Sequence, residues 1–162
     1  AVVTNAGYEK ANAADSVGEL KPANLSKRTN EKLEAILPPF VGVDPLLDIT
    51  PMSNDSVYEQ ALSVLLEDPN VDAAVFSVVP HSSMISTTDR DVLKSPTNLA
   101  TRIAGLAKQT SKPIVASITV QPNAQGLYSR LGYILEESGV PVFFSARQSI
   151  RMLSRYLTSG SL

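Results

Sequence analysis

Residues 73–79 read Ala-Ala-Val-Phe-Ser-Val-Val, and this segment decides the fold. A nearly unbroken apolar run of this length, rich in β-branched residues, is typical of a strand that is covered on both faces. A second run of this kind lies at residues 114–118, and helical patterns surround both runs. Strands that alternate with helices predict a parallel sheet with helices on both faces.

Five candidate strands lie at residues 1–4, 19–25, 71–79, 113–120 and 140–144. Pro22 limits the second of them to an edge or an irregular stretch. Residues 40–50 form an apolar loop or partial strand, because Gly42 and Pro45 interrupt them. The five strands in this order fit a three-layer, flavodoxin-like α/β domain with strand order 2-1-3-4-5. In such folds a ligand lies at the carboxyl ends of the strands.

Helical periodicity predicts the remaining elements. Helices are expected at 9–16, 26–37, 98–110 and 124–138, another between the possible caps at 53–55 and Asp68, and a last one after Ser145. The polar stretch at 81–97 is expected to be a long loop. One domain therefore covers residues 1–158, and 159–162 form a small polar tail.

Composition narrows the class of protein. The chain has 162 residues, of which 43% are hydrophobic and 19% charged, so it is expected to be ordered. Its net charge of −2 offers no basic field for nucleic acid, which is not expected as a partner. Cys is absent, which excludes disulfides, thiolate metal sites and cysteine nucleophiles.

Neither a membrane segment nor a signal peptide is expected. The longest apolar stretches run about five to seven residues, against the roughly 20 that span a bilayer. A membrane partner is not expected, and a cytoplasmic location is. The chain begins with Ala inside its first predicted strand. It is therefore interpreted as a piece of a longer polypeptide, with removal of an initiator Met as the alternative.

The first strand, turn and helix form the main candidate site, at Asn5, Ala6, Gly7, Tyr8, Glu9 and Lys10. A helix that begins after a tight turn presents free N–H groups and a partial positive charge, which suit a phosphate group. However, one glycine is a weak signal, and neither a Walker A motif nor G-x-G-x-x-G is present. Glu9 in the first turn would also satisfy the helix dipole by itself, so this alternative stays open.

Other polar residues give weaker candidates. Asp44 and Asp48 bracket an irregular loop, where they could bind a metal but are expected to support the backbone. His81 follows the best strand and could act as an acid, a base or a nucleophile. It has no evident orienting partner, so it is expected to be dispensable. No metal site is expected.

Several segments in order resemble the NDP-forming (ADP-forming) acyl-CoA synthetases, relatives of succinyl-CoA ligase. The resemblance is to the second flavodoxin-like domain of the ligase module and covers roughly residues 2–157. It is carried by V-T-N-A-G (3–7), A-A-D (13–15), D-P-L-L-D-I-T-P-M (44–52), L-E-D-P-N-V-D-A (66–73), K-P-I-V-A-S (112–117) and E-E-S-G-V-P-V-F (136–143). Each motif is modest alone, but the set in this order is specific.

The resemblance implies a part of a larger enzyme. Such an enzyme interconverts an acid, CoA and ATP with acyl-CoA, ADP and phosphate, and a phosphohistidine carries the phosphoryl group. The resemblance implies that the helix after residues 5–10 faces this phosphohistidine. The phosphohistidine, CoA-binding and ATP-grasp domains would be separate partners that bind CoA, ATP or ADP, and Mg. This chain would then supply no catalytic residue, bind no cofactor alone, and be inactive in isolation.

Two departures from the family pattern affect this interpretation. Many members have G-G-P-G where this chain has Gly7-Tyr8-Glu9-Lys10, and Asp44 replaces a usual Asn. Loss of glycines limits how closely the backbone can approach a phosphate. A second hypothesis is therefore a regulatory or structural ligase-like domain, as in a pseudoenzyme or a ligase–acetyltransferase fusion. A free-standing receiver domain is disfavoured, because Asn5-Ala6-Gly7 lacks its acidic pocket.

Overall fold

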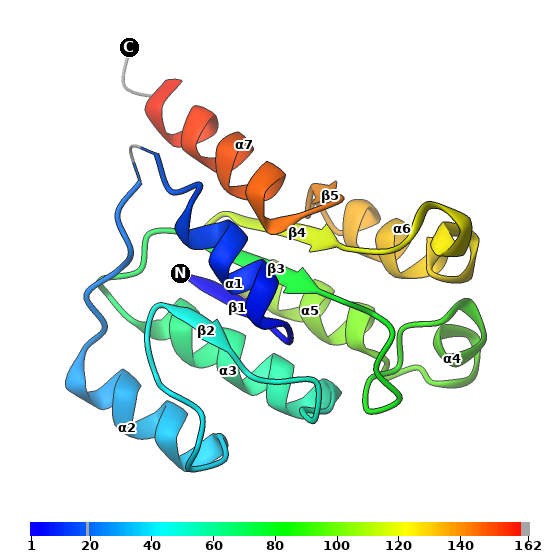
Figure 1. Cartoon of the computed structure of the whole chain (residues 1–162), viewed down its shortest axis with the longest axis horizontal. Helices are drawn as coiled ribbons and strands as arrows, with labels where there is room; N and C mark the ends of the chain where they lie inside the picture. The colour runs from blue at the N-terminus through cyan, green and yellow to red at the C-terminus, as the bar shows by residue number, and fades with distance from the viewer. Residues whose placement is uncertain (19, 160–162) are drawn as a thin grey trace.

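A computed structural model describes residues 1–18 and 20–159 and shows a five-stranded parallel sheet. The strand order is β2-β1-β3-β4-β5, so the predicted flavodoxin-like topology is confirmed (Figure 1). The strands are β1 (Val2–Thr4), β2 (Leu46–Asp48), β3 (Ala74–Val78), β4 (Ile114–Ile118) and β5 (Val142–Phe143). Every residue of β3 and β4 is buried, as their apolar runs predict.

Helices cover both faces of the sheet and form the predicted three layers (Figure 1). One layer holds α1 (Gly7–Ala14) and α7 (Ala146–Ser159). The opposite layer holds α2 (Lys27–Ile36), α3 (Asp55–Glu67), α5 (Leu99–Gln109) and α6 (Ser129–Glu137). A short helix, α4 (Asp89–Lys94), packs beside α6, which follows a 3-10 turn, η1 (Pro122–Leu127). None of the helices in the described residues is both long and apolar enough to cross a membrane.

The pleat of the sheet divides the core into two apolar clusters. Val75 of β3 faces α1 and α7, whereas the neighbouring Phe76 faces the α3 and α5 layer. The protein exposes 8405 Å². This is close to the roughly 7,800 Å² expected for a monomer of its mass. The chain thus forms a compact unit with its own sheet and cores.

The position of the second strand corrects the prediction. Residues 20–25 form no strand, and residue 19 lies outside the described residues. The strand is Leu46–Asp48, within the segment that was expected to be a loop or partial strand. Pro45 does not prevent it, because the carbonyl of Pro45 only has to accept the N–H of Val2 at 2.7 Å. An edge strand of three residues gives a weak sequence pattern.

Some boundaries also differ from the prediction. The loop at 81–97 contains α4, which begins with a capping box formed by Thr88 and Asp91. The helix expected from 124 begins as η1, and α6 starts only at Ser129. At the other end, α7 extends to Ser159, and residues 160–162 of the predicted tail lie outside the described residues.

Candidate functional site

The carboxyl ends of the strands meet at one edge of the sheet, at the right in Figure 1. Asn5 fixes the turn after β1 to this edge. Its side-chain amide donates to the carbonyl of Val79 at 3.0 Å, and its oxygen accepts from the Val79 N–H at 2.9 Å. The side chain of Asn5 is buried. Asn5, one of the predicted site residues, therefore holds the turn in place and does not face solvent.

The N-terminus of α1 opens onto this edge. Ala6 is the N-cap and offers no side-chain acceptor, and Gly7 and Tyr8 are exposed. The first N–H groups of a helix have no acceptor within the helix. The first turn of α1 can therefore receive an acceptor group from outside.

Acidic side chains border this turn. Asp48 Oδ2 lies 3.4 Å from the position that a Cβ on Gly7 would take, while Oδ1 accepts from the Thr50 N–H at 2.9 Å. Thr50 has a φ of 69°, which is strained for a β-branched residue. Lys10 forms an ion pair with Asp44, whose other oxygen accepts from the N–H of the second residue after it. Lys10 is therefore already engaged.

Glu9 points inward, away from the edge. Its side chain is 1% exposed, and Oε2 accepts from the Ala146 N–H at 2.6 Å and from the Ser77 hydroxyl at 3.4 Å. Asn12 donates to Oε1 at 3.3 Å. Ala146 lies 137 positions away, so no local pattern indicates the contact.

Tyr8 lies beside Glu9 but stays at the surface. Burial raises the pKa of its phenol, the charge of Glu9 raises it further, and a hydrogen bond with Thr119 partly offsets both. The Thr119 hydroxyl also donates to the carbonyl of Phe144 at 3.2 Å. Tyr8 and the backbone of Phe144 therefore both lie near Thr119.

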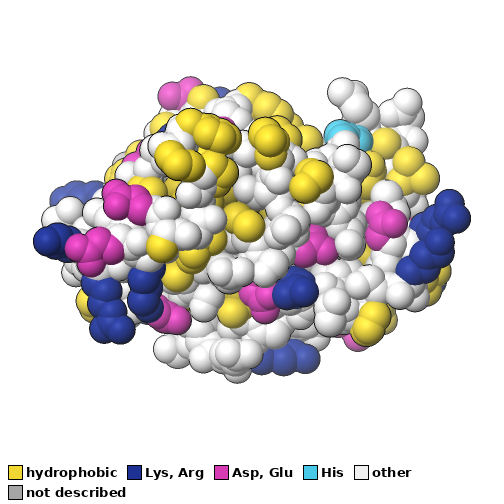
Figure 2. Space-filling view, turned by 90° about the horizontal axis from the view of Figure 1, so that it is seen from below, with side chains coloured by type: hydrophobic (Ala, Val, Ile, Leu, Met, Phe, Trp, Pro, Cys, Tyr) yellow, Lys and Arg dark blue, Asp and Glu magenta, His cyan; other side chains and the backbone are white. Residues whose placement is uncertain are grey.

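An exposed apolar side chain follows the carboxyl end of each of the five strands. These side chains are 50–71% exposed, and we call them the carboxyl-edge surface: Tyr8, Met52, Met84, Leu127 and Phe144. On the face that Figure 2 shows, acidic and basic side chains are intermixed, and no field of one sign dominates. Single exposed apolar residues are ordinary, but one after every strand is a feature of this edge.

His81 also lies near this edge, and it does have a partner. Its Nδ1 is 3.0 Å from the Tyr128 hydroxyl, and the two rings meet edge to face at 5.4 Å. The expectation that nothing orients His81 is therefore wrong. Tyr128 comes 47 residues later, after β4, so only the fold brings the two together. Among the described residues, no group of three His, Asp or Glu side chains is placed to hold a metal.

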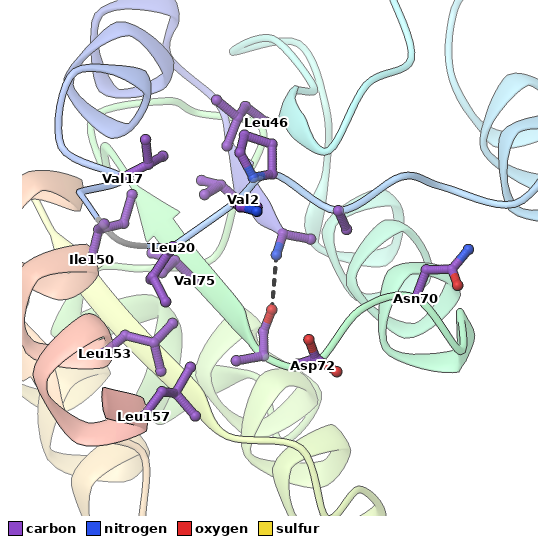
Figure 3. Close-up of a pocket in the computed structure, with 15 residues that line it drawn as sticks. Val2, Val17, Leu20, Leu46, Asn70, Asp72, Val75, Ile150, Leu153 and Leu157 are labelled. Carbon is purple, nitrogen blue, oxygen red and sulfur yellow. Dashed lines mark hydrogen bonds between the residues drawn. The ribbon is translucent and has the colours of Figure 1, made fainter. Parts of the chain in front are cut away.

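Two cavities lie away from this turn, on either side of α7. One, of about 430 Å³, is lined by apolar side chains of α7 and the sheet, such as Val75 and Leu153 (Figure 3). Asn70 and Asp72 lie at its other side. The second, of about 460 Å³, lies between α7 and the start of β4. Neither is lined by residues 5–10, so the predicted site is an open surface.

The comparisons with known proteins agree with this architecture. No family model matches the chain. It is 30% identical over 148 residues to ADP-forming acetate–CoA ligase II, subunit alpha, of Pyrococcus furiosus, a match that covers 88% of this chain and 30% of that subunit.

Solved structures share the fold. A protein of Pyrococcus horikoshii OT3 has a TM-score of 0.77 and 25% identity, over 93% of this chain and 33% of its own. Acetyl-coenzyme A synthetase 1 of Ca. Korarchaeum cryptofilum, solved with phosphate and ADP, has a TM-score of 0.77 and 19% identity, over 99% of this chain and 32% of its own. The chain thus spans about a third of the length of these relatives. In sequence the chain is thus similar to part of an ADP-forming acetate–CoA ligase subunit, and in fold to part of an acetyl-coenzyme A synthetase, which agrees with the resemblance to the NDP-forming (ADP-forming) acyl-CoA synthetases.

Proposed function

We propose that this chain is a docking domain of an ADP-forming acyl-CoA synthetase, which presents the N-terminus of α1 to a phosphohistidine on another domain. The complete enzyme would join an acid to CoA while ATP is converted to ADP and phosphate. In this proposal the CoA-binding, phosphohistidine and ATP-grasp domains bind CoA, ATP or ADP, and Mg. The chain itself contributes a surface and no catalytic residue.

The observation that carries the proposal is the uncapped start of α1 within the carboxyl-edge surface. A helix N-terminus favours an acceptor or an anion, and Ala6 supplies no side-chain cap. The exposed apolar residues around it suit a protein partner better than a small polar ligand. An open edge of this kind supports docking, because a partner domain can bring its own reactive group to the helix.

The charge around the turn supports the regulatory or structural alternative. Asp48 borders Gly7, and Lys10 is already paired with Asp44. A phosphoryl group adds about 1.5 to 2 negative charges, which these carboxylates would repel. The two proposals therefore differ in one respect: only the first requires that a phosphorylated partner approach α1.

Two exposed tyrosines, one at the start of α1 and one near the end of α7, can be used to distinguish these proposals. Tyr8 is 52% exposed on the carboxyl-edge surface, and Tyr156 is 67% exposed near the end of α7. The variants Tyr8→Asp and Tyr156→Asp are made in an enzyme that joins this chain to the three partner domains. Phosphohistidine formation and acyl-CoA synthesis are measured, together with urea unfolding of each variant.

We expect Tyr8→Asp to lower both rates by about tenfold or more, because it places a further negative charge beside the approaching group. Tyr156→Asp should change neither rate by more than about twofold. Equal losses of rate in the two variants would place the docking surface elsewhere. If neither variant changes the rates, the regulatory or structural proposal is favoured.

A further inference from the structure

A buried carboxylate joins the two helices that cover one face of the sheet. Glu9 stands in the first turn of α1, and Ala146, to which it is hydrogen-bonded, is the first residue of α7. Both ends of this contact are buried, with Glu9 1% and Ala146 0% exposed. Burial of a carboxylate is costly unless hydrogen bonds or opposite charge compensate it. The surroundings of Glu9 therefore indicate what the residue does.

Helix ends and dipoles surround Glu9. The ion pairs in the described part of the chain do not include it. Its hydrogen-bond donors are the Ala146 N–H, the Ser77 hydroxyl and the Asn12 amide. The carboxylate lies at the positive ends of two helices, its own and α7, where a negative charge is favoured. The Glu9 side chain thus occupies, from within the protein, the place at the start of α7 where a bound anion would be favoured.

The start of α7 depends on this carboxylate. Ser145 Oγ accepts from the Gln148 N–H at 3.3 Å, which satisfies one of the first donors of the helix. The N–H of Ala146 is too deeply buried to reach water, and Glu9 accepts from it. A buried donor without an acceptor destabilises the fold. The cap of α7 is therefore completed by a side chain of α1.

We propose that Glu9 is a positioning residue: by capping α7 from α1, it holds Tyr8 and Phe144 of the carboxyl-edge surface in one arrangement. Tyr8 precedes Glu9, and Phe144 comes two residues before Ala146. At the surface, the Thr119 hydroxyl donates to the carbonyl of Phe144 at 3.2 Å and lies near Tyr8. The partner of this surface rests on the proposed function. The role of Glu9 in holding Tyr8 and Phe144 can be tested in this chain alone.

Hydrogen exchange in the 162-residue chain tests the positioning without any partner. The variant is Glu9→Gln, which keeps the shape but removes the charge. The control is the same substitution at Glu34, which is an exposed residue of α2. We expect the Ala146 amide to exchange roughly tenfold faster in Glu9→Gln, because a charge-assisted hydrogen bond is replaced by a weaker neutral one. The Phe76 amide in β3 and all amides of the control should be unchanged. Equal acceleration at Ala146 and Phe76, or none, would overturn the proposal.

Chemical rescue tests whether the negative charge is the important property. In Glu9→Ala, added acetate should raise the thermal midpoint more than acetamide, which has a similar shape but no charge. Glu34→Ala should respond equally to both. An equal effect of the two additives on Glu9→Ala would mean that Glu9 only fills space, which contradicts the proposal. If Glu9→Ala does not fold, the exchange rates of Glu9→Gln decide alone.

Discussion

Asp68 shows at the scale of a residue how a buried carboxylate stabilises a helix and a loop together. It accepts from the N–H groups of Ser26 and Asn70, both at 2.8 Å. Burial alone would raise its pKa, but hydrogen bonds from Thr29, Asn70 and Ser26 outweigh this and lower the pKa to about 2. The folded state therefore favours the ionised form.

The pH dependence of stability follows from that shift. Asp68 has a folded pKa of about 2, below its reference value of 3.8. Its contribution is thus present above about pH 4 and is lost as the pH falls towards 2. We expect Asp68→Asn to lower the free energy of unfolding by about 1–2 kcal/mol at pH 7, with a smaller difference at pH 2–3. Urea unfolding between pH 2 and 7 measures this, with the exposed Asp15→Asn as control. A difference independent of pH would contradict the assignment.

The sequence predicts the candidate site only where residues close together in the chain determine the structure. A helix after the first strand and a turn is predicted at 9–16, and the structure shows it slightly earlier, at Gly7–Ala14. The direction of Glu9 could not be predicted, because an acidic residue in a first turn has a local explanation that hides its distant contact. The pairing of His81 with Tyr128 could not be predicted either, because Tyr128 comes 47 residues later and only the fold brings the two together.

At the scale of an element, the caps of the helices are local signals that the structure retains. Asn54 Oδ1 accepts from the Val57 N–H at 3.0 Å at the start of α3. We expect Asn54→Ala to lower the free energy of unfolding by about 1 kcal/mol, because the helix loses its cap. Asn30→Ala, inside α2, is the matched control and should be neutral or slightly stabilising, because alanine favours a helix interior. Urea unfolding followed by circular dichroism measures both, and equal losses would rule out a capping effect.

The strands differ in how far the sequence predicts them. The runs that form β3 and β4 are apolar throughout because helices cover both faces, so their burial is visible in composition. In contrast, β2 has three residues and pairs only with β1, at the edge of the sheet. It is a strand because its backbone is hydrogen-bonded to β1, and backbone pairing of this kind gives only a weak sequence pattern.

At the scale of the whole molecule, the two ends of the sheet have different surfaces. The carboxyl edge carries an exposed apolar side chain after each strand, whereas two apolar-lined cavities lie along α7, away from residues 5–10. Because all the strand pairs are parallel, the segments that follow the strands lie at one edge, and the sequence places an exposed apolar residue in each of them. A domain built in this way can present five segments to one partner at once.

The same arrangement predicts that the isolated chain has no synthetase activity. Phosphoryl transfer relies on positioning and on charge stabilisation by several groups held together. Around α1, this chain offers backbone N–H groups, an inward Glu9 and a paired Lys10. We therefore expect the purified chain, free of host ligase, to form no acyl-CoA from ATP, CoA and a free acid. Addition of the three partner domains should restore synthesis, and restoration should require Tyr8 more than Tyr156. Synthesis that copurifies with the chain alone would show that it holds a complete active site, and the docking proposal would then be wrong.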